Sequence, residues 1–386
     1  MVDGQAITEN VLKQTAGARL YFIDNLRTLL AVLVVMHHAG QPYGPGGGWW
    51  IPAEPASAID TLVLGGFFAI NMSFFMGLFF LISAYFVPGS YDRKGAWTFF
   101  KDRLIRLGLP IVIFAFAVFP IMIYLLNGFT SFGSFYLGTY LSPGAPDGTG
   151  LTFGHLWFLE QLLIFSGLYV AWRVATDRRI SLPKVKFPGD LAIVAFAVVM
   201  GLAMFAVRIV SPINHWIPVL SFEPAHYPEY VALFVVGVLA YRNDWFRTLP
   251  AATGRKWGNI AILLGVALFV LFIIFGGSLT SGGPTVASLA MSLWEAFMCV
   301  SMCIALVALF RGRFNIQGKV AKALSDSSFT VYLIHIPVIV FLQYMLIGVS
   351  LPNLAKFAIV CLVGVPACFL LSHYIVRRLP FAKYVL

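Results

Sequence analysis

An otherwise apolar stretch near the N-terminus, residues 21–38, carries four side chains that can do chemistry: Asp24, Arg27, His37 and His38. Ionisable groups inside a membrane span are costly, and by default they suggest a functional site. Arg27 and His38 are 11 positions apart. On a helix, both side chains then fall on nearly the same face, about 16 Å apart along the axis. The spacing predicts one helical face with an arginine at one end and a histidine at the other.

Polar residues in the apolar runs fall at two depths. The halves that we assign to the cytosolic side carry Asp24, Arg27, Ser83, Arg103, Arg106, Tyr332 and His335, and the outer halves carry His37, His38, Asn71, His155, Glu160 and Glu295. Two polar levels predict two ends of one cavity.

Each of these residues also has a purely structural interpretation. Asp24 and Arg27 are three positions apart and can neutralise each other as an intrahelical ion pair. His335 can be a satisfied buried histidine. Glu160 and Glu295 can form buried structural pairs with a histidine, or they can fix a histidine tautomer, which is the arrangement that a general base needs.

Regular catalytic motifs are absent. The sequence has no Gly-x-Ser-x-Gly elbow, no His-Glu-x-x-His, no Gly-x-Gly-x-x-Gly and no P-loop. A metal site formed by His37, His38 and Glu160 is disfavoured, because adjacent residues on a helix point about 100° apart. We therefore predict no metal, and chemistry from residues scattered over several spans.

The composition indicates a polytopic membrane protein. The hydrophobic fraction is 60%, the charged fraction is 11% and the mean hydropathy is +0.86, whereas about a quarter of the residues in soluble domains are charged. The formal charge of +10 could indicate a nucleic-acid partner, but the basic residues lie between apolar runs rather than on one exposed face. We predict an all-α fold of about ten transmembrane helices in a lipid bilayer, with no nucleic acid.

The apolar runs set the expected topology. With about 20 residues per span, we predict spans at 20–40, 60–87, 104–126, 156–175, 190–210, 228–241, 258–276, 286–310, 328–348 and 355–376. Nearly all of the 26 Lys and Arg residues lie on one side of this map. The positive-inside rule therefore predicts that both termini are cytosolic.

The remaining segments of the sequence give less information about function. Residues 1–18 lack the apolar core of a secretory signal, so we expect a cytosolic tail followed by one transmembrane domain, 19–386. The opposite loops carry Trp49, Trp50, Trp157 and Trp216, which suit the membrane interface or, alternatively, sugar stacking. The four cysteines, predicted to pack in the interior, are Cys299, Cys303, Cys361 and Cys368.

Five motifs, in order along the chain, resemble the membrane acyltransferase family 3, which includes O-antigen, peptidoglycan, glucan and macrolide O-acyltransferases. They are Arg27-x10-His38, Phe-Phe-Leu-Ile-Ser83-Ala-Tyr-Phe86, Lys101-Asp-Arg103-Leu-Ile-Arg106-Leu-Gly-Leu-Pro110, His155-Leu-Trp-Phe-Leu-Glu160 and Ser325-Asp-Ser-Ser-Phe-Thr-Val-Tyr-Leu-Ile-His335. Ala84 stands where the family usually has Gly, and its methyl group could tighten helix packing. The chain resembles a stand-alone form without an appended esterase-like domain.

The resemblance implies an O-acyltransferase of the inner (cytoplasmic) membrane, acting in the cell envelope. It implies transfer of an acyl group, usually from acyl-CoA as a co-substrate without a tightly bound cofactor, to a hydroxyl of a carbohydrate or glycolipid. Phe-rich and Met-rich walls would suit acetyl, succinyl or longer chains. The implied catalytic residues are His38, Arg27, Glu160 and Glu295, and the implied substrate-binding residues are Arg103, Arg106, His335, Tyr332, Ser83, His37, Asp24 and Trp157.

Within this interpretation, Arg27, Arg103 and Arg106 form a basic entry for the phosphates of coenzyme A. His38 acts as general base on the acceptor hydroxyl, oriented by Glu160 or Glu295, or it carries the acyl group covalently.

Two other functions remain compatible with a polytopic chain. A transporter or exporter of an anionic or acylated solute would also bury charge, but the sequence lacks the internal repeat of many transporters. A receptor or structural protein would leave the five motifs unexplained.

Overall fold

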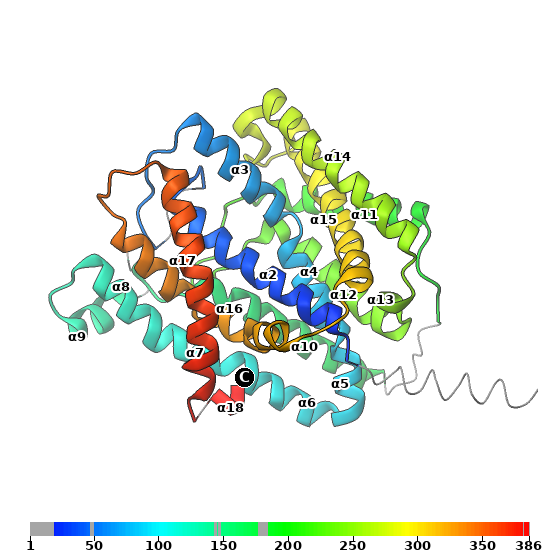
Figure 1. Cartoon of the computed structure of the whole chain (residues 1–386), viewed down its shortest axis with the longest axis horizontal. Coiled ribbons are helices and arrows are strands. Elements are labelled where there is room, and N and C mark those ends of the chain that lie inside the picture. The colour runs from blue at the N-terminus through cyan, green and yellow to red at the C-terminus, as the bar shows by residue number, and fades with distance from the viewer. Residues whose placement is uncertain are drawn as a thin grey trace, which may run out of the picture.

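The computed structural model describes residues 19–46, 50–142, 145, 148–176, 184–380 and 382–385. These residues form an all-helical bundle without strands (Figure 1), which confirms the predicted fold class. The expected cytosolic tail, 1–18, and Trp49 lie outside the described residues.

Ten longer helices build the bundle. They are α2 (Tyr21–Gly40), α3 (Ala58–Met72), α4 (Phe75–Tyr85), α10 (Trp157–Ala175), α11 (Asp190–Arg208), α12 (Tyr227–Arg242), α14 (Ala251–Phe275), α15 (Val286–Arg313), α16 (Lys319–Met345) and α17 (Asn353–Tyr374). Shorter helices continue the second and third spans or connect others: α5 (Val87–Lys94), α6 (Ala96–Arg103), α7 (Leu109–Ile113), α8 (Phe119–Asn127), α9 (Phe132–Phe135), α13 (Trp245–Thr248) and α18 (Ala382–Val385).

Nine helical stretches of the described chain are long and apolar enough to cross a membrane, and they match nine of the ten predicted spans. The predicted sixth span forms α12, whose 16 residues rise about 24 Å, less than the roughly 30 Å of a hydrocarbon core. α12 nevertheless joins the two ends of the bundle. It begins beside the Arg208 and His226 side chains and ends where Arg242 pairs with Asp92 at 2.5 Å.

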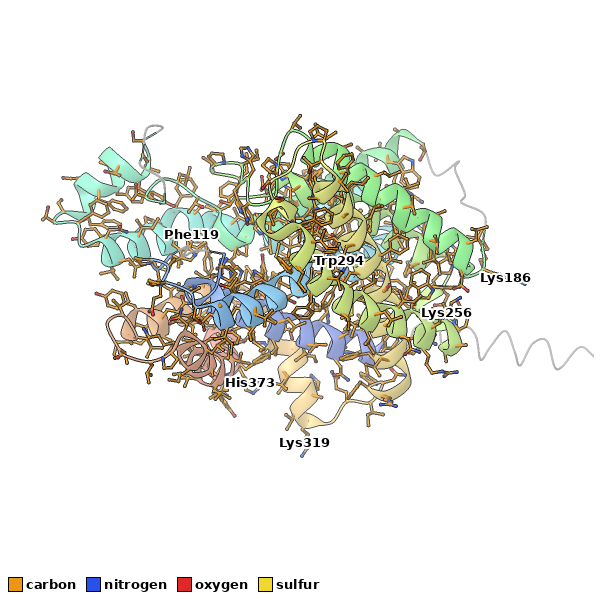
Figure 2. All side chains as sticks on the ribbon, turned by 90° about the horizontal axis from the view of Figure 1, so that it is seen from above. Phe119, Lys186, Lys256, Trp294, Lys319 and His373 are labelled. Carbon is orange, nitrogen blue, oxygen red and sulfur yellow. The ribbon has the colours of Figure 1, made fainter. Side chains whose placement is uncertain are left out.

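Several helices begin earlier than their apolar runs. α16 starts at Lys319, nine residues before the predicted 328. The predicted span began only after the charged residues. Lys322 and Asp326 pair at 2.5 Å one helical turn apart, so the helix includes them. Seen from above, Lys186, Lys256 and Lys319 lie toward the edge of the molecule and Trp294 lies near its middle (Figure 2).

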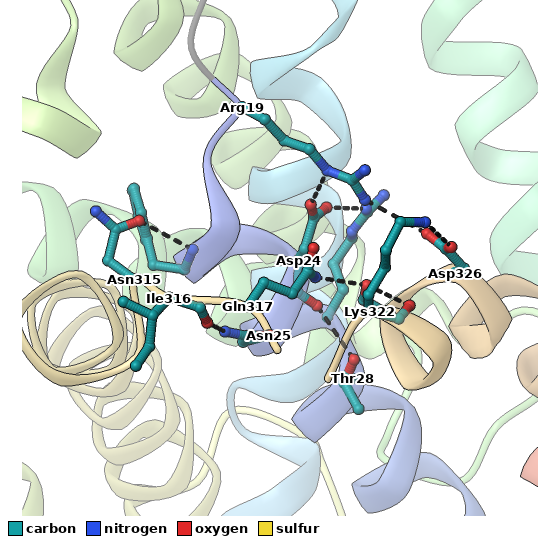
Figure 3. Close-up of polar contacts among 12 residues, drawn as sticks. Arg19, Asp24, Asn25, Thr28, Asn315, Ile316, Gln317, Lys322 and Asp326 are labelled. Atoms are coloured by element: carbon teal, nitrogen blue, oxygen red, sulfur yellow. Dashed lines mark hydrogen bonds and ion pairs between the residues drawn. The ribbon is translucent and has the colours of Figure 1, made fainter. Parts of the chain in front are cut away.

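Segments that are distant in the sequence meet at the basic end of the bundle. Asp24 at the start of α2 accepts from Arg19 at 2.6 Å, and Arg19 also reaches Asp326 of α16 at 3.4 Å (Figure 3). Asn25 donates to the carbonyls of Phe314 and Ile316, between α15 and α16. These contacts hold the N-terminal end of α2 against the α15–α16 connection.

The opposite end of α2 is fixed by α16 and α17. Gln343 of α16 donates to the carbonyl oxygens of His38 and Ala39 at 2.9 and 3.2 Å. Asn353 of α17 donates to the carbonyls of Tyr43 and Pro55, and Lys356 donates to both carboxylate oxygens of Glu54 at 2.7 Å. The connection between α2 and α3 is therefore held on the N-terminal end of α17.

α2 lies in the middle of the bundle (Figure 1) and packs against α3, α4, α15, α16 and α17. One side of it, including Leu26, Leu30 and Val34, joins the largest apolar core. Val35 and Ala39 join a second core built mainly with α16 and α17. The helix that carries Arg27 and His38 is thus a rigid part of the interior.

Two spans are not continuous α-helices. The second breaks at Ser73 and Phe74, between α3 and α4. The third contains π-helical turns at Leu104–Gly108 and Phe114–Val118. Pro110 and Pro120 follow within two residues, where a missing N–H and a bulky ring disturb the regular ladder. The first of these turns carries Arg106.

α4 and α12 pack unusually closely. A Cβ at Gly237 of α12 would approach the carbonyl oxygen of Leu81 and would lie 2.7 Å from the Ala84 methyl of α4. Ala84 is fully buried. The extra methyl noted in the sequence therefore fills the contact between the helices, opposite a glycine that leaves room for it.

We predict that Gly237→Ala destabilises the protein by about 1–3 kcal/mol, because the added methyl overpacks this contact. Gly265→Ala on α14 is the matched control: its Cβ would meet nothing within 4 Å, and alanine favours a helix by up to about 1 kcal/mol. Thermal unfolding in detergent measures both. Equal melting temperatures for the two variants would contradict the close α4–α12 packing.

Candidate active site

A cavity of about 1450 Å³ opens beside the C-terminal half of α2. His37 and His38 line it from α2, Trp157 from α10, and Glu295 from α15. Gly65, Gly66 and Gly276 also border it, together with apolar side chains. The cavity is large enough for a polyhydroxylated ligand of several rings, with a histidine and a carboxylate in its walls.

His38 is half-buried at the wall of this cavity. Its Nδ1 lies 2.9 Å from Oε1 of Gln41, three residues further along. An amide oxygen only accepts hydrogen bonds, so Nδ1 carries the proton and the lone pair lies on Nε2. In this tautomer the ring is set up to take a proton at Nε2.

Glu160 and Glu295 do not orient His38 in this structure, contrary to the expectation from sequence. Glu295 forms an ion pair with Arg208 of α11. Glu160 lies in the first turn of α10, accepts from Gln161 at 3.4 Å and acts electrostatically on the Tyr227 hydroxyl of α12. The His38 Nδ1 instead contacts the neutral amide of Gln41.

Three histidine rings meet below the cavity. The His335 ring centroid lies 5.2 Å from that of His38 and 4.7 Å from that of His155. Tyr332 belongs to the same group, since its hydroxyl donates to the His155 carbonyl. The assignment of His335 and Tyr332 to the cytosolic level was therefore wrong: α16 carries both to the level of His38.

A second polar group lies on the far wall of the cavity. Arg208 is almost fully buried and donates to the Ala225 carbonyl at 3.3 Å, to Ser292 at 3.2 Å and to His226 Nδ1 at 3.3 Å, besides its ion pair with Glu295. The positive charge of Arg208 lies inside the bundle, so the loss of any of these partners would lower the stability of the fold.

Glu223 and His226 extend this group into the loop before α12, and both line the cavity. His226 Nε2 lies 3.5 Å from a Glu223 oxygen. Burial raises the pKa of Glu223 to about 7, and burial together with the nearby Arg208 charge holds the pKa of His226 well below its usual value. Near neutral pH, Glu223 is thus partly protonated beside a neutral imidazole, and it can donate to a ligand as well as accept from it.

The basic end contains the intrahelical ion pair that was the structural alternative for Asp24 and Arg27. Arg27 pairs with Asp24, as expected for residues three apart. The Arg27 charge acts on Arg106, and Arg106 acts on Arg103, so three guanidinium groups gather there. In the described chain, Arg103 and Arg106 lie over the rings of Phe99 and Phe329 at 5.3 Å rather than against carboxylates. This end has unneutralised positive charge.

The remaining predicted residues are spread around these groups. His37 is buried among Phe67, Phe68 and Phe75 and lies 3.4 Å from the Asn71 amide nitrogen. Trp157 is 8% exposed and stacks on Tyr230 at 5.3 Å, so it lines the cavity and is no interfacial anchor. Ser83 lies on α4, and no described contact joins it to His38.

Sequence reasoning missed Gln41, Arg208, Glu223 and His226 as site residues. For Gln41 there was a signal, because it lies one helical turn after His38. For Arg208 the one signal was a positive charge near the end of the apolar run 190–210. No spacing in the sequence connects Glu223 and His226 to residues of α15.

Residues 20–373 match a family described as an acyltransferase domain. The chain is 22% identical to proteins named glucans biosynthesis protein C from Salmonella paratyphi B, Salmonella dublin and Salmonella gallinarum, over 97% of this chain and 96% of each relative. No solved structure matches. The match covers the bundle, both polar ends and the cavity.

We predict that Glu295→Ala destabilises the protein by about 3 kcal/mol or more, because Arg208 keeps a buried charge without its carboxylate. Asp102→Ala is the matched control, since the Lys94–Asp102 pair is 43% and 47% exposed and such pairs contribute about 1 kcal/mol or less. Thermal unfolding in detergent gives both values, and adding Arg208→Met to Glu295→Ala should recover part of the loss. A cost no larger than that of Asp102→Ala would refute a structural role for the buried pair.

Proposed function

Because this chain belongs to the membrane acyltransferase family 3, and so is an acyltransferase, we propose that it transfers an acyl group from acyl-CoA to a hydroxyl of a glucan or related carbohydrate, with His38 as general base. One observation carries the proposal. His38 lies in the wall of the large cavity with its Nδ1 bound to Gln41 Oε1, which leaves Nε2 as the basic atom on the acceptor side.

The donor enters from the basic end. Coenzyme A is a polyanion, and Arg27, Arg103 and Arg106 present three guanidinium groups, of which Arg27 is paired with Asp24. Guanidinium–phosphate hydrogen bonds are among the strong charge-assisted ones. With this end cytosolic, as the positive-inside rule favours, the pantetheine arm runs along α2 and brings the thioester toward His38, about 16 Å further along the helix axis.

The acceptor occupies the large cavity. Glu223 and His226 offer hydrogen-bonding groups on one wall, and Trp157 and Trp216 line it with aromatic surface, a combination that suits sugar hydroxyls and the apolar faces of sugar rings. The relatives named for glucan biosynthesis favour a glucan among the carbohydrates.

The chemical step needs one base and one leaving group. His38 Nε2 takes the proton of the acceptor hydroxyl, and the oxygen attacks the thioester carbonyl. The C–O bond forms, the C–S bond breaks and the coenzyme A thiolate leaves. The proton taken by His38 finally protonates that thiolate, so the products are an ester and the free thiol.

We predict that His38→Ala lowers the rate of ester formation about 10²- to 10⁴-fold, the usual contribution of a positioned base. Gln41→Ala should lower it less, because the ring remains but its tautomer is no longer fixed. Purified protein incubated with acetyl-CoA or succinyl-CoA and glucose oligosaccharides, with the ester measured by mass spectrometry, tests both. His373→Ala on α17 serves as control, and a fully active His38→Ala variant would exclude the general-base role.

A second prediction concerns the donor. Arg106→Gln should raise KM for acetyl-CoA about 10-fold or more, since a hydrogen bond to a charged group contributes about 1.5–3 kcal/mol, but it should leave KM for acetyl-pantetheine, which lacks the nucleotide phosphates, almost unchanged. Arg93→Gln, an exposed arginine in the last turn of α5, is the control. An equal rise in KM for acetyl-CoA and acetyl-pantetheine would show that Arg106 does not recognise the nucleotide phosphates.

A further inference from the structure

The two ends of the bundle differ in charge. The basic end gathers the guanidinium groups of Arg27, Arg103 and Arg106. In the part of the chain that the structure describes, no lysine or arginine borders the large cavity at the other end. The residues that do border it come from four stretches whose sequence contains neither lysine nor arginine. These stretches are 28–92, 107–172, 209–241 and 257–310.

Arg208 and Lys356 lie at the cavity end of the bundle, and each is paired with a carboxylate. Arg208 forms its ion pair with Glu295. Lys356 donates to both carboxylate oxygens of Glu54 at 2.7 Å. Among the described residues, a ligand in the cavity therefore meets no lysine or arginine whose charge is not already compensated.

Glu223 adds a carboxylate to the cavity wall. It is 3% exposed and borders the cavity from the loop before α12. Its Oε1 accepts from the backbone N–H of Asn214 at 2.5 Å, and its Oε2 lies 3.5 Å from Nε2 of His226, which burial and the Arg208 charge keep neutral by lowering its pKa. When Glu223 is ionised, its described contacts are thus both to neutral groups.

An anionic ligand in this cavity would meet a like charge and no free counter-charge. At the effective dielectric constant of about 20 that applies near protein surfaces, like charges within about 7 Å of each other repel strongly. The anion would also lose hydration without gaining an ionic partner. A neutral sugar has neither cost, because its hydroxyl groups can donate to an ionised Glu223 or accept from a protonated one. The cavity is therefore suited to an uncharged polyhydroxylated ligand.

We propose that Glu223 makes the acceptor cavity selective for uncharged carbohydrate, so that sugars carrying a carboxylate, phosphate or sulfate group are rejected. The inference rests on the proposed function, since it places the acceptor in this cavity. The same distribution of charge keeps the two substrates apart. The phosphates of coenzyme A bind at the basic end and are repelled from the acceptor cavity, so the donor does not compete with the acceptor for its site.

This selectivity depends on pH. Burial raises the pKa of Glu223 to about 7, so Glu223 gains its negative charge as the pH rises from 6 to 8. The titratable and charged groups that act on it or contact it are Arg208 of α11, Glu295 of α15, His226, and Tyr230 of α12. Rejection of an anionic acceptor should therefore become stronger over this interval.

The test compares two acceptors that differ in charge but hardly in shape. One is a glucose disaccharide whose terminal CH₂OH group is oxidised to a carboxylate, which stays ionised between pH 6 and 8. The other is the corresponding uronamide, which is neutral. Both compete in one reaction for the acetyl group of acetyl-CoA, and mass spectrometry measures the two esters. The ratio of the two kcat/KM values does not depend on the amount of folded enzyme.

The wild type should prefer the uronamide about 10- to 100-fold at pH 8, and less at pH 6. Glu223→Gln keeps an oxygen for the Asn214 N–H but removes the charge. Its preference at pH 8 should be about 5-fold or more below that of the wild type, with most of the pH dependence lost. Asp102→Asn, in the exposed pair with Lys94, is the control and should keep the wild-type ratio. A purely structural role of Glu223 would lower both rates and leave their ratio unchanged.

Equal use of the two acceptors by the wild type at pH 8 would overturn the inference, and so would a wild-type ratio in Glu223→Gln. If Glu223→Gln does not fold, the wild type alone decides, because a ratio that is the same at pH 6 and pH 8 contradicts the role of Glu223. In these cases esters still form on carbohydrate, and the proposed function stands. Absence of ester on both acceptors and on the unmodified disaccharide would instead refute the proposed function.

Discussion

The bundle depends on one constraint: a polar group inside a membrane must find its partner within the protein, because hydrocarbon offers none. α2 meets this constraint at both ends. Asp24 pairs with Arg19 and Arg27, and the last carbonyls of the helix are satisfied by Gln343. Other polar side chains can then lie on α2 between these ends, because the groups that hold the helix in place are paired within the protein and need no partner from the lipid.

Buried polar groups near the cavity meet this constraint to different degrees. Arg208 makes an ion pair and three hydrogen bonds to surrounding groups, as a buried charge requires if it only stabilises the fold. His335 and His155 each leave a ring nitrogen unsatisfied. Incomplete pairing is a cost to the fold, and here it lies next to His38, the general base that we propose.

Much of the architecture could be predicted from the sequence, because length and hydropathy determine which segments cross a membrane. The spacing of Asp24 and Arg27 allowed the ion pair that the structure contains, and sorting polar residues by depth correctly placed Arg27, Arg103 and Arg106 at one level. Depth along a span was harder to predict. His335 was assigned to the wrong level because α16 begins nine residues before its apolar run, and an apolar run gives no information about how far a helix is shifted against its neighbours. The pairing of Glu295 with Arg208 depended on packing between separate helices.

The pairing of Lys356 with Glu54 has a consequence for how the protein assembles. Pro45, Gly46 and Trp50, in the connection between α2 and α3, border the large cavity, and this connection is fastened to α17 by contacts spanning about 300 positions of sequence, such as the 302 between Glu54 and Lys356. α17 is synthesised about 300 residues after this connection. The cavity therefore has no complete wall until α17 has inserted and docked, and the site becomes competent only after that step.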